Sequence, residues 1–318
     1  MNEAVMAQSS EAPVEDELRG ELAQGDVVLG TLGPILGHLL ANHDHSLFSD
    51  EIVSRIRGMI GDLAGQMLVA QAEATESPDV QGFAQRERDT LGAQLLTDMR
   101  LVVHCHAKAL EWQLTTRLER RNAIDPVLSP LLQALIASDD ASVASSAMGA
   151  LAAQARFVQH QRRMELPLGE LPADLFHEVL GIWSDNAEDL AAVSIATGRL
   201  RDAYDESGSR LGLLSRLVTG MGAGAMAALA LAHGGVALFL SALAALTHQE
   251  RDLAVVSTND RQLARLALSL RAAGLKPKEI EEQFLLFHPD VSLPDGFDAL
   301  RADRAAALLA ASGRANAY

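Results

Sequence analysis

The chain has 318 residues, of which 48% are apolar and 4% aromatic, and its formal net charge at pH 7 is −16. This length allows one large domain or two ordinary ones with a buried core. The negative charge repels phosphate backbones, so nucleic acid is not an expected partner. Cys105 is the single cysteine, which excludes an intrachain disulfide, and the first residues lack the basic and apolar segments of a secretory signal. We therefore expect a cytoplasmic protein.

Alanine and leucine, the strongest apolar helix formers, supply most of the apolar residues. Apolar runs of strand length with alternating polarity are absent from the sequence. The composition therefore predicts an all-α fold.

Residues 1–17 are polar and acidic and predict a disordered tail. Residues 18–40 follow as one or two helices, with Gly33-Pro34 as a break. Ser49 can cap the next helix, whose apolar residues recur at helical spacing: Ile52, Ile56, Ile60, Leu63, Met67 and Ala70. One long helix is expected over residues 83–120. Together these helices predict a bundle over residues 18–122, and amphipathic bundles of this kind often form homodimers.

A domain boundary is expected near residue 123, because Asp125-Pro126 restarts the chain. Over residues 123–290 shorter helices follow in pairs, about every 40–50 residues, which approximates the period of HEAT-type solenoids. The pairs are 126–137 with 140–163, 172–184 with 186–206, 210–232 with 236–247, and 259–273 with 277–287. A compact helical bundle is the alternative architecture. Residues 291–318 are expected to form a C-terminal tail with one short helix.

The segment Leu217–Thr247 has no charged residue and is long enough to span a bilayer. Its many alanines and glycines insert weakly, however, and His233-Gly234-Gly235 interrupts it. We therefore expect two buried helices, 222–232 and 236–247, and no membrane insertion. Small residues spaced by four predict a closely packed face on the first helix: Gly220, Gly224, Ala228 and Ala232.

Two stretches of the second half resemble a known family. One is QHQRRMELPLGELPADLFHEVL, and the other is ALAHGGVALFLSALAALT followed by LRAAGLKPKEIEEQFLLF. Over roughly residues 125–290 they resemble an alphaproteobacterial helical family classed as a domain of unknown function, numbered two thousand three hundred and thirty-six. Where that family usually has an acidic residue after a glycine, this chain has Gly234-Gly235. The resemblance implies a helical, solenoid-like fold and a bacterial cytoplasm, and it supplies no catalytic residues.

His104 and His106 do not predict a metal site. Residues two apart on a helix point about 200° apart, so both rings cannot bind one ion. We expect His106 in the core, and His104 on a polar face with Arg100, Lys108 and Glu111.

The loop histidines His43 and His45, with Asp50 nearby, can converge on a metal ion. The simpler interpretation is a polar helix connection in which Asp44 suits a turn. Since no second ligand pair with standard spacing exists, no metal is favoured here. Histidine phosphotransfer is a further hypothesis for the N-terminal bundle, although the residues after His104 do not match the familiar motif.

Arginines near the end of one predicted helix can bind a phosphate or an acidic partner: Arg156, Arg162 and Arg163. A solvated helix end, where cations favour the C-terminus, is the simpler interpretation. The glycines from Gly220 to Gly224 do not predict a phosphate-binding loop, because they follow a helix and lack the closing Lys.

No arrangement of catalytic residues is identifiable from spacing, and no cofactor is expected. The leading hypothesis is a non-enzymatic protein-interaction or scaffold module whose partner is another protein. The alternatives are a signalling or metal-binding protein that uses the N-terminal histidines, and a helical enzyme whose site the sequence does not reveal.

Overall fold

The structure is a computed structural model that describes residues 3–41 and 50–312, with side chains described over 13–36 and 50–312. In these residues it has fourteen α-helices and no strand, which confirms the all-α fold. The chain divides into two units: unit 1 is Met1–Leu32, Leu110–Leu151 and Leu214–Tyr318, and unit 2 is Gly33–Ala109 and Ala152–Leu213. The unit edges fall inside helices, and none lies at the boundary expected near residue 123.

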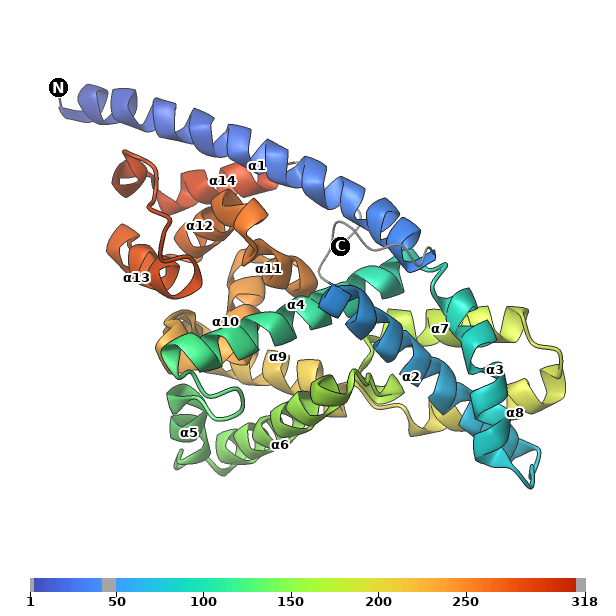
Figure 1. Cartoon of the computed structure of the whole chain (residues 1–318). Helices are drawn as coiled ribbons and strands as arrows, with labels where there is room; N and C mark the ends of the chain where they lie inside the picture. Colours follow the sequence, from blue (N-terminus) through green and yellow to red (C-terminus); the bar gives the residue numbers. More distant parts are fainter. Residues whose placement is uncertain (1–2, 42–49, 313–318) are drawn as a thin grey trace. The chain divides into compact units, whose positions relative to one another are not determined.

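Unit 1 is built around α10 (Leu231–Thr247), which packs against α5 (Pro130–Ile136), α11 (Arg251–Ser257) and α12 (Leu263–Ala272). The rings of Phe239 on α10 and Phe287 at the end of α13 (Pro277–Phe287) lie 5.2 Å apart in the core. α14 (Ala302–Ala311) packs against α12 (Figure 1). Since α5 packs against α10, far along the chain, unit 1 is a bundle and not a stack of consecutive pairs.

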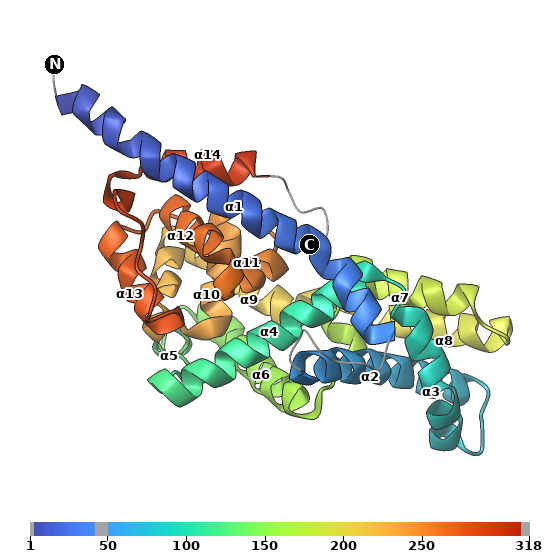
Figure 2. The same cartoon turned by 45° about the horizontal axis from the view of Figure 1, so that its top comes forward.

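The N-terminal part of α1 (Glu3–Ala41) belongs to unit 1 and lies along α12 and α14 in both views (Figures 1 and 2). Glu15 forms an ion pair with Arg304 at 2.7 Å, and Asp26 forms one with Arg265. Gln262 donates a hydrogen bond to the carbonyl of Gly25 at 2.8 Å. These polar contacts fix the register of α1 against unit 1.

α1 differs from two expectations. Residues 3–17 are helical and not a disordered tail, because Val14 and Leu18, one turn apart, are both buried. The helix also continues through Gly33-Pro34. Pro34 is exposed, so solvent can reach the carbonyl of Gly30 that a proline at this position leaves without its helical donor.

Unit 2 is a bundle in which α2 (Asp50–Ala74) packs against α3 (Val80–Leu95) and α8 (Leu190–Ala203). α7 (Ala173–Asp185) packs against both α3 and α8. The predicted stripe of α2 is confirmed for five of its six members, since these are buried: Ile52, Ile56, Ile60, Leu63 and Met67. Helices expected in the separate ranges 18–122 and 123–290 thus share one core.

The expected long helix over residues 83–120 is wrong, because the structure breaks it between α3 and α4 (Met99–Asn122). The Asp98 carboxylate accepts a hydrogen bond from the backbone N–H of Leu101 at 2.9 Å. An aspartate at this position satisfies an N–H that has no helical acceptor, so it starts a new helix.

The segment 222–232 does not form the predicted α-helix. A 3-10 helix, η3 (Gly222–Leu229), follows α9 (Arg210–Met221) and ends before α10 begins. A 3-10 helix has three residues per turn, and accordingly Ala225 and Ala228 are buried while Gly224 and Ala232 are exposed. The predicted four-residue stripe of small residues is therefore wrong. Gly235, at φ 68°, bends the chain inside α10.

One helical stretch of the described residues, Arg210–Leu229, is long and apolar enough to cross a membrane, with a mean hydropathy of 1.3 over its most apolar window. α10 and α11 pass the same test only when taken together, as a pair bent by 113°. Length and composition alone decide this test, and core helices of soluble proteins also pass it.

Candidate functional site

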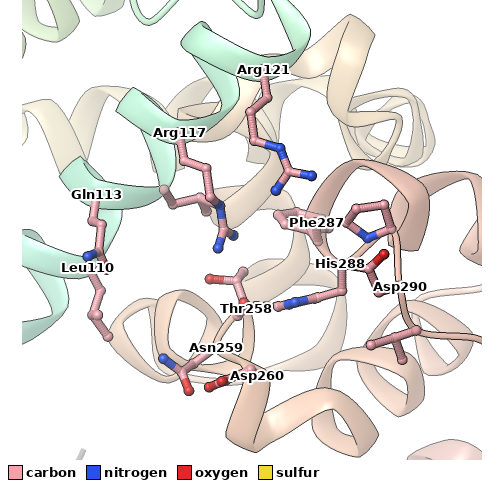
Figure 3. A pocket seen from close by; sticks show the side chains of 13 residues that line it. Leu110, Gln113, Arg117, Arg121, Thr258, Asn259, Asp260, Phe287, His288 and Asp290 are labelled. Carbon is pink, nitrogen blue, oxygen red and sulfur yellow. Dashed lines mark hydrogen bonds between the residues drawn. The ribbon is translucent and has the colours of Figure 1, made fainter.

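The C-terminal half of α4 brings two arginines to one wall of a cavity in unit 1. Arg117 and Arg121 are four residues apart, so they lie one above the other on the same helix face. They belong to the last turns of α4, where cations favour the carbonyl end of the helix dipole. Figure 3 shows both guanidinium groups pointing from α4 into the cavity.

Two loops form the opposite walls. Thr258, Asn259 and Asp260 follow α11, and the segment 287–291 begins at the last residue of α13. The Asn259 side chain caps the short turn after α11 by accepting a hydrogen bond from the N–H of Arg261 at 3.0 Å. The cavity is open to solvent and has a volume of about 370 Å³, which lies within the range of about 300–1,000 Å³ for small-ligand sites.

Arg117 is half-buried, and this burial is the main cause that lowers its pKa. The neighbouring charge of Arg121 lowers the pKa further, while Asp260 raises it. Its Nε is buried without a hydrogen-bond partner, and neither arginine forms an ion pair with any residue that the structure describes. Two cations are therefore held side by side, one of them partly removed from water, with no direct counter-charge.

His288 also lines the cavity, and its ring makes a hydrogen bond to the backbone. Its Nε2 is 2.9 Å from the carbonyl oxygen of Thr258, and because that oxygen only accepts, Nε2 carries a hydrogen and donates. Burial is the main cause that lowers the pKa of His288, which favours the neutral ring. The Thr258 hydroxyl donates to the carbonyl of Val255 at 2.7 Å. Both polar groups thus help to shape the cavity wall through hydrogen bonds to backbone carbonyls.

Two carboxylates, Asp260 and Asp290, also line the cavity. In Figure 3 Asp260 lies on the side away from α4, and Asp290 lies next to His288. The cavity therefore presents positive charge on the α4 wall and negative charge on its other walls. This arrangement can bind and orient a charged ligand.

The arginines that the sequence offered as weak candidates for anion binding are elsewhere, and the simpler interpretation there was a solvated helix end. Arg156, Arg162 and Arg163 are all exposed on α6 (Ala141–Arg163) in unit 2 and do not line the small cavity beside His160 and Glu165. Glu165 pairs instead with His160, whose Nδ1 lies 3.0 Å from its carboxylate. The three arginines thus form no shared site in the described structure.

The metal candidates His43 and His45 lie outside the described residues, and Asp50 is exposed at the start of α2. Among the residues that are described, no group of three or more His, Cys, Asp or Glu side chains could hold a metal ion.

His106 is buried as expected, but the polar face predicted for His104 is wrong. His104, Lys108 and Glu111 are each no more than 2% exposed. The central part of α4 is covered on all sides, so polar residues on it do not mark a solvated face. A phosphoacceptor histidine must be reached by another protein, and His104 in this conformation is not accessible.

Sequence reasoning missed Arg117, Arg121, Asp260 and His288. Signals for them exist: two arginines at helical spacing before a chain restart, and turn residues Asn259-Asp260 and His288-Pro289 directly after helices. What the sequence does not show is that these three segments meet.

Comparisons of the chain with protein-family models, curated proteins and solved structures find no match. The resemblance to the alphaproteobacterial helical family therefore stays a prediction.

Proposed function

We propose that the chain is a non-enzymatic binding protein of the bacterial cytoplasm, in which unit 1 receives an anionic group in the cavity beside Arg117 and Arg121. The observation that carries the proposal is this arginine pair, which has no partner among the described residues and faces an open cavity. Like charges four residues apart on a helix repel, and partial burial adds a desolvation cost. An anion between the two guanidinium groups offsets both costs, and arginine matches carboxylate and phosphate geometry.

The experiment measures thermal unfolding of the full chain with increasing acetate or phosphate at constant ionic strength. A ligand that binds only the folded state stabilises it by about 1.4 kcal/mol when its concentration is about ten times the dissociation constant. We expect this stabilisation to be lost in the double variant Arg117→Gln/Arg121→Gln. The control is Arg120→Gln, since Arg120 neighbours Arg121 but is exposed and does not line the cavity. Equal stabilisation of all three proteins would refute the proposal.

A protein-interaction module is the second candidate, and two exposed apolar side chains on α8 in unit 2 favour it. Leu190 is 65% exposed and Ile195 50% exposed, on different sides of the helix. Exposed side chains of this size are available for contact with a protein partner. In affinity purification from the native bacterium, Ile195→Glu should lose a partner that the wild type retains. Identical partners for both proteins would remove this candidate.

A further inference from the structure

Side chains of opposite charge line opposite walls of the cavity in unit 1 and form no ion pair with one another. Arg117 and Arg121 stand on α4, while Asp260 and Asp290 stand on the two loops across the space. None of the four forms an ion pair with another described residue. The four charged groups therefore face one space without pairing to one another, which leaves room for a ligand between them.

A ligand of one sign matches only part of this space. A simple anion gains from the arginines but meets the repulsion of two carboxylates, and a simple cation meets the reverse. Asp260, Asp290 and Arg121 are exposed. A bound ion with a single charge would match one wall of the cavity and leave the opposite wall unmatched. A molecule with a charge at each end matches both walls at once.

We propose that the ligand is a small zwitterion, with a carboxylate toward Arg117 and Arg121 and an ammonium toward Asp260 and Asp290. This rests on the proposed function, because it assigns the anionic group and adds its opposite end. A volume of about 370 Å³ accommodates a molecule of amino-acid size. The Asn259 side chain, on the same wall as Asp260, supplies an amide that can accept from the ammonium or donate to the carboxylate.

The test titrates the full-length chain calorimetrically with ω-amino acids from glycine to 6-aminohexanoate, which scan the distance between the two charges. For the best length, the matched probes are the alkanoate and the alkylamine of equal chain length. We expect the amino acid to bind at least about tenfold more tightly than either matched probe. In Asp260→Asn/Asp290→Asn this preference over the alkanoate should vanish, while alkanoate binding is kept or improved. Asp298→Asn, an exposed substitution outside the cavity, should behave as the wild type.

The outcomes separate the two proposals. If the alkanoate binds as tightly as every amino acid, and Arg117→Gln/Arg121→Gln abolishes that binding, the zwitterion inference is overturned and anion binding stands. If no anion and no amino acid binds in an arginine-dependent way, both are overturned. If the preference for the amino acid survives in Asp260→Asn/Asp290→Asn, the ammonium does not face these carboxylates and the inference fails.

Discussion

Gly234 lies where α10 passes closest to η3, and an alanine there should destabilise unit 1. A Cβ built on Gly234 would lie 2.3 Å from the carbonyl oxygen of Ala228 and 2.9 Å from both its carbonyl carbon and its Cα. All three are backbone atoms, so no side-chain rotation relieves the clash. The two segments would have to separate until the first distance grows from 2.3 Å to at least 3.0 Å.

Ala228 is fully buried and the surrounding core is close-packed. Forcing an extra methyl group into such a site costs about 1–3 kcal/mol. We therefore expect Gly234→Ala to lower the free energy of unfolding by this amount, measured by guanidinium denaturation followed by far-ultraviolet circular dichroism.

Gly220 is the matched control. It belongs to α9, and an added Cβ would meet nothing within 4 Å. An alanine in such a helical position restricts the unfolded chain and should stabilise by about 0.4–1 kcal/mol. Equal denaturation midpoints for Gly234→Ala and the wild type would refute the close approach of η3 and α10.

Three further predictions concern charge and metal. Burial raises the pKa of Asp62 in the folded protein above its unfolded value of 3.8. Ionised Asp62 therefore lowers the free energy of unfolding at a pH above its pKa in the folded state, and this loss is absent below pH 3.8. In Asp62→Asn the side-chain oxygen can still accept the hydrogen bond from the Leu166 N–H, which is 2.9 Å long in the wild type. In urea denaturation at pH 7 this variant should be at least as stable as the wild type, and at about pH 3 it should have no advantage. A clear loss of stability at pH 7 would contradict this. Arg251→Met removes an ion-pair partner of Glu111, which is 1% exposed, and should lower the free energy of unfolding by about 3–5 kcal/mol. Adding Glu111→Gln should recover most of that loss. A double variant as unstable as Arg251→Met would contradict this prediction. Elemental analysis of untagged protein should find less than one zinc per chain, whereas one full equivalent that His43→Ala removes would establish the metal hypothesis.

The sequence predicted the buried face of α2 and most helix ends, because these depend on residues close together in the chain. The apolar spacing of Ile52, Ile56 and Ile60 predicted a buried face of α2, and the structure buries it. Most helices after residue 125 begin and end near the predicted residues because Pro, Gly and Asp mark their ends. These signals act over one or two turns of chain.

The failures concern contacts between distant segments. Nothing near Lys108 or Glu111 indicates that other helices cover α4, so their polarity suggested a solvated face. The alanine and glycine run at 222–229 was consistent with an α-helix, and the 3-10 form places Ala225 and Ala228 inward instead. The cavity of Arg117 was likewise invisible, because its α4 wall lies more than a hundred residues before the two loops that complete it.

The most direct test of the anion site follows the Arg117 side chain by ¹⁵N nuclear magnetic resonance. An anion that binds the guanidinium of Arg117 should move its Nε–H resonance, which is assigned through its loss in Arg117→Lys. We predict a saturable shift on titration with acetate at constant ionic strength, while the Nε–H of the exposed Arg120 stays in place. An Arg117 resonance that does not move, or that moves only as far as that of Arg120, would contradict the proposed function.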